Sequence, residues 1–395
     1  MPAVSDLPGD WDGLVVLCAA NPWEGVRLAD QHLAEHLARL TPVLYVDPPM
    51  SWLTPLRRPA RAAALREPRL RLLGPSLARL TPVVLPGTER VAMSLVTTAL
   101  ARRALRHAVA ALGGSVRAVI ATSALIRMLG ACKEPLGVHW VQDDVAGSAA
   151  LLGLSARRLA RGEARLAARA DTLVVASQVL AERWQRRGHR TVLIPYGVDT
   201  AAFADVEAAP QPDDVELPAP VAGFVGHLSD RIDLRLLEAV AARGHSLLLV
   251  GPLHPQFDAT RMRDLLSLPN VRWVGAKPFE SLASYLRVID VGLVPYTDSP
   301  FNRGSFPLKT LEYLAAGRGV VATDLPAVRW LGTELITVRS GPGPFADAVT
   351  EALHSPRSAE LAGLRRAFAA EHDWSRRAAD VARLAGIDAG APVPA

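Results

Sequence analysis

Runs of apolar residues alternate with stretches of helical periodicity along most of the chain. The apolar runs are rich in Val, Leu and Ile and predict buried strands. These strands are expected at 14–19, 43–47, 80–85, 116–121, 137–142, 172–176, 191–194, 221–226, 246–250, 271–274, 291–295, 319–323 and 334–338. Helices are expected between and after them, at 26–40, 90–112, 123–131, 155–169, 177–187, 307–317, 342–354, 357–370 and 374–384. This alternation is typical of parallel α/β sheets.

A segment rich in proline and acidic residues interrupts the pattern. Residues 201–220 contain four prolines after position 209 and five acidic side chains, a composition that predicts a linker. A chain of 395 residues is long enough for two domains. We therefore expect two doubly wound, Rossmann-like α/β domains, at 1–200 and 221–370.

Composition narrows the class of protein further. Hydrophobic residues make up 50% of the chain and charged residues 21%, as in folded globular proteins. Cys18 and Cys132 lie in apolar surroundings without metal-ligand spacing and are expected to be reduced core residues. Asp6, Asp10 and Asp12 precede the first apolar run, and no run is long enough to span a bilayer. The expected location is cytoplasmic, with at most a peripheral contact with a membrane.

Positive charge is concentrated in the first half of the chain. Residues 1–200 contain 25 Lys and Arg against 16 Asp and Glu, whereas residues 201–395 contain 19 against 23. This asymmetry predicts an anionic partner, such as a membrane surface or an acidic acceptor. Nucleic acid is not expected, because the arginines are not interleaved with aromatic residues. The arginine-rich segment Arg57–Arg71 is either a solvated basic stretch or an interfacial contact.

The helix predicted at 307–317 has an unusual first turn. Pro307 suits the first turn of a helix, Ser305 is the expected N-cap, and Gly317 ends the helix. Lys309 lies where the helix dipole disfavours a cation, which is understandable if an anion such as phosphate binds there. Glu312 shares the face of Lys309 and would then accept hydrogen bonds from sugar hydroxyls. An exposed Lys–Glu pair, contributing about 0.3–0.5 kcal/mol, is the alternative.

An acidic pair follows the strand predicted at 137–142. Asp143 and Asp144 directly follow this strand, and doubly wound sheets bind ligands at the carboxyl ends of their strands. The pair is therefore a candidate for chemistry. The alternative is an N-cap for the next segment.

The stretch from Pro307 to Pro326 resembles a known donor-site motif, that of the retaining GT-B glycosyltransferases. It reads PLKTLEYLAAGRGVVATDLP. The resemblance implies that Glu312 holds the donor ribose and that Lys309 meets the diphosphate. The family motif has a second glutamate eight positions earlier, where this chain has Gly304. The segment Pro195–Asp199 is similar to the PxGVD signature at the crossover between the two domains of that family.

The resemblance also implies roles for residues elsewhere in the chain. The glycine of the first loop, Gly25, would let the backbone approach the diphosphate, and Arg231 would bind that group. The turn ending at Lys277 resembles the loop that reads the nucleotide base, and Asp143 or Asp144 would meet the acceptor hydroxyl. The donor-binding candidates are Gly25, Gly226, Arg231, Lys277, Asn302, Ser305, Lys309 and Glu312. A final helix in 371–395 is expected to return to the first domain.

The implied activity is transfer of a sugar from a nucleoside-diphosphate sugar to an acceptor hydroxyl across a cleft between the two domains. Such enzymes are metal-independent, need no further cofactor and retain the anomeric configuration. The acceptor would be a polysaccharide, a lipid-linked sugar or a natural product. Two alternatives stay open: a sugar-nucleotide epimerase of the same architecture, and a non-catalytic partner protein, which Gly304 would allow.

Overall fold

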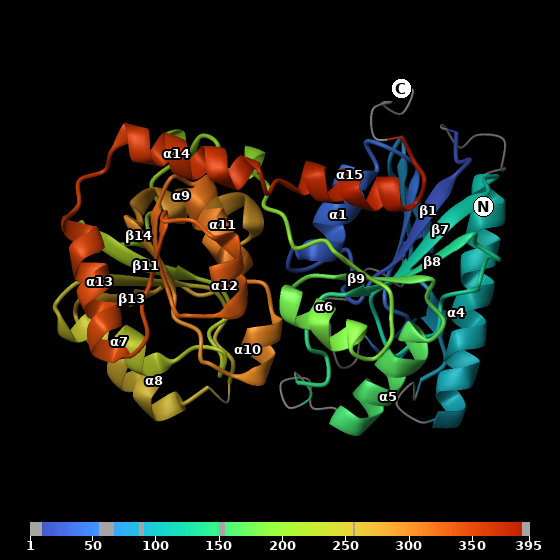
Figure 1. Ribbon diagram of the computed structural model, residues 1–395, viewed down its shortest axis with the longest axis horizontal. Helices are drawn as coiled ribbons and strands as arrows, with labels where there is room; N and C mark the ends of the chain where they lie inside the picture. Colours follow the sequence, from blue (N-terminus) through green and yellow to red (C-terminus); the bar gives the residue numbers. More distant parts are fainter. Residues whose placement is uncertain are drawn as a thin grey trace. The chain divides into compact units, whose positions relative to one another are not determined.

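The computed structural model divides the chain into two compact units, which are described separately below. It describes residues 10–54, 67–86, 91–147, 149, 155–255 and 257–388. The first unit comprises residues 1–195 and 374–395, and the second comprises residues 196–373. Each unit is built around its own mainly parallel sheet with helices on both faces (Figure 1). The predicted fold class, two doubly wound α/β domains, is confirmed.

The first unit contains an eight-stranded sheet in the order β10-β9-β8-β7-β1-β2-β5-β4. All neighbours are parallel except β4 and β5, which are antiparallel. The strands are β1 (Leu14–Cys18), β2 (Val43–Val46), β4 (Leu70–Gly74), β5 (Leu77–Leu80), β7 (Val116–Ala121), β8 (Leu136–Val141), β9 (Thr172–Val175) and β10 (Thr191–Leu193). Strands β3 (Met50–Ser51) and β6 (Val83–Val84) form a separate short pair. The apolar runs become strands because β1, β2 and β9 are buried along their whole length.

Helices cover both faces of the first sheet (Figure 1). They are α1 (Ala29–Leu37), α4 (Val91–Leu112), α5 (Ala156–Ala167), α6 (Gln178–Gln185) and α15 (Trp374–Leu384). Helix α15 comes from the far end of the chain and packs against α1. The buried ring of Trp374 stacks on His32 with 5.8 Å between ring centroids. This contact between the two ends of the chain makes α15 part of the first unit.

The second unit contains a six-stranded, all-parallel sheet in the order β13-β12-β11-β14-β15-β16. Its strands are β11 (Val221–Val225), β12 (Ser246–Val250), β13 (Val271–Trp273), β14 (Val291–Val294), β15 (Gly319–Ala322) and β16 (Ile336–Val338). Its helices are α7 (Leu234–Ala242), α8 (Ala259–Leu266), α9 (Leu282–Val288), α10 (Pro300–Gly304), α11 (Leu308–Ala315), α12 (Pro326–Leu331), α13 (Pro342–His354) and α14 (Ala359–Ala370). Helices α11 and α14 pack together on one face, and α7 and α13 on the other (Figure 1).

The segment expected to be a linker is part of the second unit. Residues 201–220 include two short 3-10 helices, Ala201–Phe203 and Val206–Ala208. Phe203 and Val206 are buried in the core of the second unit. These two apolar side chains therefore attach the segment to the second unit, although its prolines and acidic side chains gave the linker signal.

Two elements predicted in the first unit differ from the structure. Residues 123–131 were expected to be a helix but form turns. The carboxylate of Glu134 accepts hydrogen bonds from the backbone N–H groups of Gly130 and Cys132, which competes with helical pairing. The strand expected at 80–85 is split into β5 and β6, because Pro82 lies between them and lacks the N–H that a ladder needs.

The start of α11 also differs from the prediction. Pro307 is its N-cap, and Ser305 is not. Ser305 ends the preceding helix α10, where its hydroxyl donates to the carbonyl of Phe301 at 3.0 Å.

Candidate functional site

Lys309 and Glu312 form a largely buried ion pair one turn into α11. The Nζ atom of Lys309 is 2.9 Å from Oε2 of Glu312. The Glu312 side chain is 9% exposed and that of Lys309 24%. Burial alone would lower the pKa of Lys309, but the charge and hydrogen bond of Glu312 outweigh it and raise that pKa. The lysine therefore remains a cation, and the alternative of a solvent-exposed pair is wrong.

Arg231 brings a second cation toward Lys309. Its guanidinium carbon lies 5.0 Å from the ring centroid of Tyr296 and 4.8 Å from that of Phe301. Its Nε donates to Oδ1 of Asn302 at 3.0 Å. The positive charge of Arg231 is also among the influences that lower the pKa of Lys309. The two cations therefore act on one another at the same end of the second sheet.

Asn302 organises the neighbourhood of Arg231. It is 1% exposed, and its Nδ2 donates to the carbonyl oxygens of Arg231 and Thr297, both at 2.9 Å. No ion pair joins Arg231 to Asp233 in the part of the chain that the structure describes, and Asp233 pairs with Arg235 at 2.7 Å. Arg231 is held by aromatic rings and an amide, so its charge is not neutralised by Asp233.

Glycines allow the loops after β11 and β12 to approach this cluster. A Cβ built on Gly226 would lie 3.4 Å from Cε of Lys309 and 2.9 Å from the ring of Phe224. Gly251 has φ +139°, and a Cβ there would be 1.9 Å from the carbonyl oxygen of Gly226. A side chain at Gly251 would therefore displace the backbone beside Lys309.

Two donor-side candidates have their polar groups engaged elsewhere. The Nζ atom of Lys277 is 2.6 Å from Asp214 and lies 5.3 Å from the ring centroid of Tyr285. Ser305 is 3% exposed and hydrogen-bonded within its own turn. Among the described residues, no hydrogen bond or ion pair joins Lys277 to Lys309 or Arg231. The structure thus brings together Gly226, Arg231, Asn302, Lys309 and Glu312.

A groove of about 510 Å³ begins beside this cluster. Tyr296, whose ring supports Arg231, forms part of its wall. Three arginine–aspartate pairs line much of the rest: Asp233–Arg235, Asp298–Arg303 and Asp324–Arg329. Its volume lies within the range of small-molecule sites, and its wall is polar.

In the first unit, the acidic pair at the end of β8 divides into two different environments. Asp144 is 5% exposed and forms an ion pair with Arg183 at 2.7 Å. Burial would raise the pKa of Asp144, but the hydrogen bonds from Arg183 and the N–H of Gly147 lower it. Burial and the charge of Asp144 raise the pKa of nearby Glu163 to about 7. Asp143 is half-buried.

The loop after β1, residues 20–26, is fixed by two buried aspartates. Asp30 accepts hydrogen bonds from the backbone N–H of Asn21 at 3.1 Å and from its side-chain amide at 2.9 Å. Asp47 accepts one from the backbone N–H of Trp23 at 2.8 Å. Such charge-assisted bonds are short and directional, so the loop backbone has a defined conformation.

The tip of this loop contains Gly25. Its φ is +123°, a value that favours glycine, and a Cβ built there would have no neighbour within 4 Å. Beside it, Glu24 pairs with the buried Arg79, which also binds Asp47 at 2.7 Å. The loop is therefore anchored on one side, while the backbone at Gly25 is open.

Asp30 also connects this loop to the acidic pair. Its Oδ1 accepts a hydrogen bond from Nε2 of Gln142 at 2.5 Å, and Gln142 immediately precedes Asp143. Sequence reasoning missed Asp30 and Gln142 because 112 positions separate them. Sequence reasoning also missed Gly251 and Tyr296. Gly251 could have been found, because it is a glycine directly after a predicted strand.

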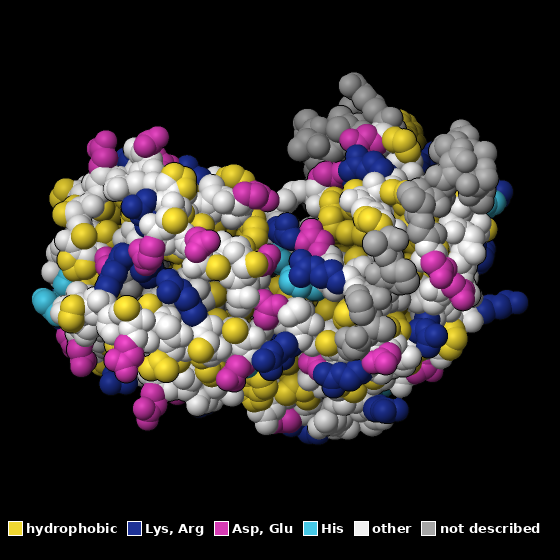
Figure 2. All heavy atoms as spheres, turned by 90° about the horizontal axis from the view of Figure 1, so that it is seen from above, with side chains coloured by type: hydrophobic (Ala, Val, Ile, Leu, Met, Phe, Trp, Pro, Cys, Tyr) yellow, Lys and Arg dark blue, Asp and Glu magenta, His cyan; other side chains and the backbone are white. Residues whose placement is uncertain are grey.

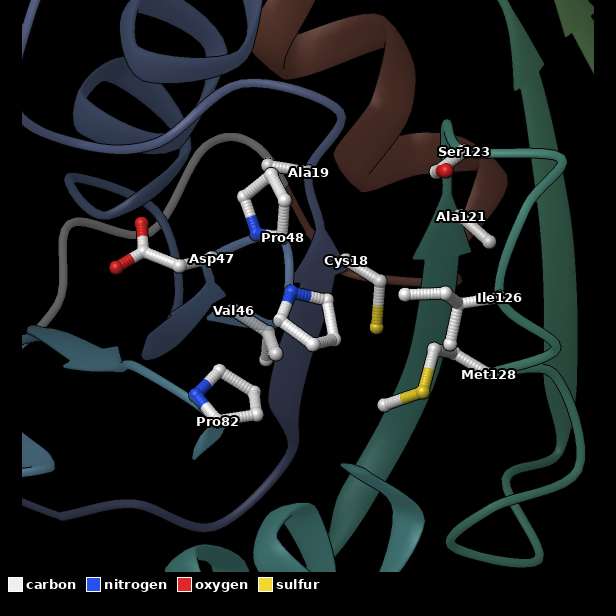
Figure 3. Close-up of a pocket in the computed structure, with 11 residues that line it drawn as sticks. Cys18, Ala19, Val46, Asp47, Pro48, Pro82, Ala121, Ser123, Ile126 and Met128 are labelled. Atoms are coloured by element: carbon white, nitrogen blue, oxygen red, sulfur yellow. The ribbon is translucent and has the colours of Figure 1, made fainter. Parts of the chain in front are cut away.

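A small cavity lies at the carboxyl ends of β1, β2 and β7 (Figure 3). The sulfur atoms of Cys18 and Met128 and the rings of Pro48 and Pro82 surround it, whereas the carboxylate of Asp47 points away. Its volume of about 20 Å³ has room for about one water molecule. The cavity is therefore too small to hold a sugar.

Comparisons with known proteins identify the class of fold. Sucrose-phosphate synthase from Thermosynechococcus elongatus has a TM-score of 0.71 at 20% identity, covering 94% of this chain and 98% of that one. HepE from Anabaena, solved in complex with UDP and glucose, has a TM-score of 0.64 at 15% identity, covering 95% and 99%. The chain has the GT-B fold that these proteins share.

Sequence comparison points to a family of glycosyltransferases. Residues 219–355 match the family described as Glycosyl transferases group 1. A protein named "Putative teichuronic acid biosynthesis glycosyltransferase TuaH" from Bacillus subtilis is 28% identical over 254 residues, 62% of this chain and 64% of that protein. Phosphatidyl-myo-inositol mannosyltransferase from Mycolicibacterium smegmatis is 29% identical over 235 residues, 55% and 58%. The chain thus covers less than two thirds of either relative, and the predicted family resemblance is confirmed.

Within the described ranges, no helix is both long and apolar enough to cross a bilayer. The same residues include no group of three His, Cys, Asp or Glu side chains that could hold a metal ion. The segment Arg57–Arg71 lies largely outside the described residues. Near its end, Arg71 lies in β4 and pairs with Glu67 at 2.6 Å.

Proposed function

We propose that this chain is a glycosyltransferase that moves a sugar from a nucleoside-diphosphate sugar to an acceptor hydroxyl, retaining the anomeric configuration. The observation that carries the proposal is the buried Lys309–Glu312 pair beside Arg231 at one end of the second sheet. Two cations and one carboxylate match the two polar parts of such a donor, the diphosphate and the ribose. Lys309 and Arg231 would bind the diphosphate, and Glu312 the ribose hydroxyls.

The main work of the second unit would be electrostatic. When the bond between sugar and diphosphate breaks, negative charge grows on the departing phosphate. Cations held in place before the reaction stabilise that charge without reorganising. Arg231 is held in this way by Tyr296, Phe301 and Asn302, and Lys309 by Glu312. The departing phosphate would itself help to deprotonate the acceptor, so the mechanism does not require a protein base.

We assign supporting roles to the other donor-side candidates. Asn302 would position Arg231, and Ser305 would end α10 so that α11 can start at the right place. We assign Lys277 to the base end of the donor, where its ion pair with Asp214 would shape the turn at 275–277. The groove beside Tyr296 would have room for the donor sugar.

The first unit would supply the acceptor side. Asp143 would orient the acceptor hydroxyl, and Asp144, through Arg183, would hold the turn that carries Asp143. The open backbone at Gly25 would approach the diphosphate. The names of the two curated relatives support an acceptor from a cell-envelope polymer or a lipid, and the excess of basic residues in 1–200 supports an anionic one.

Calorimetric titration with UDP, GDP and ADP tests the proposal. We expect at least one to bind, and Arg231→Gln to weaken it at least tenfold, as expected from loss of a charged hydrogen bond worth about 1.5–3 kcal/mol. Arg243→Gln, which changes an exposed arginine of the same unit outside the groove, is the matched control and should bind like the wild type. Binding of none of the three nucleotides would instead support a non-catalytic partner. Epimerisation of the nucleotide sugar without any acceptor would support an epimerase.

A further inference from the structure

Helix α5 of the first unit is basic on the side that faces solvent. Arg157, Arg161 and Arg165 recur at every fourth position and are exposed, and the exposed Arg169 continues the series just past the helix end. Residues four apart lie on one side of a helix, about 6 Å from one another along its axis. We call these four arginines the basic face.

The basic face is electrostatically unfavourable for the helix that carries it. Like charges four residues apart destabilise a helix, and Arg157 lies in the first turn, where the dipole disfavours a cation. The one acidic residue of α5, Glu163, is buried on the opposite side. None of the four arginines forms an ion pair with another residue in the part of the chain that the structure describes. Arg165 lies in the last turn, where the dipole favours a cation, but folding gives no reason for Arg157 and Arg161.

We propose that the basic face of α5 binds the surface of a membrane that contains anionic lipids. The other exposed side chains of residues 156–169 are alanines: Ala156, Ala160, Ala164 and Ala168. None of these described side chains is a ring that could stack on a sugar or a base. A convex row of this kind suits a plane of negative headgroups better than a single polymer strand.

A nearby apolar residue fits the same partner. Leu125 is 44% exposed in the turn after β7. The carbonyl oxygen of its neighbour Ala124 would lie 2.6 Å from a Cβ built on Gly162, so this turn packs directly on α5. By contrast, basic and acidic side chains are interspersed over the face drawn in Figure 2. Helix α5 lies at the lower end of the first unit in Figure 1.

Vesicle co-sedimentation with the full chain tests the inference. The probe vesicles are phosphatidylcholine alone and an equimolar mixture of phosphatidylcholine and phosphatidylglycerol. We expect binding only to the mixed vesicles, and weaker binding as salt is raised. Each arginine near an anionic surface strengthens binding about fivefold, so Arg161→Gln with Arg165→Gln should weaken it about 25-fold.

The matched control removes two exposed arginines from α4 of the same unit, Arg103→Gln with Arg106→Gln. It changes net charge equally, so equal weakening by the two double variants would mean that total charge alone drives binding and would overturn the inference. Binding of soluble polygalacturonate through Arg161 and Arg165, without vesicle binding, would identify a polymer partner and also overturn it. Nucleoside-diphosphate affinity should be the same in both variants, which separates this outcome from failure of the proposed donor site.

Discussion

Lys309 and Glu312 offer a sharp test of the donor site, because their loss should differ in kind. Lys309 would meet charge that grows as the glycosidic bond breaks, whereas Glu312 would hold hydroxyls that do not change during the reaction. Lys309→Ala should therefore lower kcat as well as donor affinity, and Glu312→Gln should chiefly raise the donor KM.

The structure sets the magnitudes. Charge-assisted hydrogen bonds contribute about 1.5–3 kcal/mol, so Glu312→Gln should raise the donor KM about ten- to hundredfold. Lys309→Ala leaves the carboxylate of Glu312 largely buried without its cation, which typically costs about 3–5 kcal/mol of stability. We expect the lower end of that range, because 24% of the Lys309 side chain is exposed and solvent screens the charge.

Glu312→Gln has a second expected effect, on pH dependence. With Glu312 neutral, burial and the charge of Arg231 remain and lower the pKa of Lys309. Donor affinity of this variant should therefore fall further than that of the wild type as the pH is raised. Steady-state kinetics and nucleotide titrations over neutral to alkaline pH measure both effects.

The double variant Lys309→Met with Glu312→Gln completes the experiment. If the pair has only a structural role, the double variant should recover the free energy of unfolding that Lys309→Ala loses. All three variants should then bind nucleoside diphosphate like the wild type. That result would remove α11 from the donor site and refute the reasoning. If the losses of donor affinity in the two single variants do not add up in the double variant, that result would support one shared site.

Three further predictions concern the first unit. Asp143→Asn should lower turnover more than donor affinity, whereas Asp144→Asn should in addition lower the melting temperature, because it breaks a buried ion pair; thermal unfolding and kinetics separate the two. Burial lowers the pKa of His139 from 6.5 to about 4, so the unfolded chain takes up a proton at a higher pH than the folded chain does. The free energy of unfolding should therefore fall as the pH drops from about 6.5 to 4, by about 1.4 kcal/mol per pH unit at most. Denaturant titrations should show a shallower fall for His139→Gln; an identical slope would contradict the assignment. Asp30→Asn, which places an amide among N–H donors, should speed hydrogen exchange in residues 20–26, and Gln142→Leu should do so much less.

Local patterns were the part of the molecule that sequence could predict. The apolar runs gave most strands to within one or two residues, because parallel strands buried on both faces have a simple signature. Lys309 and Glu312 were recognisable because three positions along a helix place two side chains together. Their burial was not predictable, since it depends on β11 and on Gly226.

Contacts between distant segments explain what sequence reasoning missed. Lys277 meets Asp214 from 63 positions away, and Asp144 meets Arg183 from 39 positions away, so neither pairing leaves a local pattern. The attachment of the segment 201–220 to the second unit was missed for a related reason. Its composition is dominated by exposed prolines and acidic residues, but the burial of Phe203 determines that the segment packs on the second unit.

The anchoring of loop 20–26 has a consequence for engineering. Its conformation depends on Asp30 in α1, Asp47 after β2 and Arg79 in β5. The loop should therefore be moved into another protein only together with these three residues. A loop transplanted into a related scaffold without them would lose its defined backbone and sample many shapes. Transplanted with them, the loop should keep the same backbone conformation, so Val26 at its exposed tip can be varied while the buried carboxylates stay unchanged.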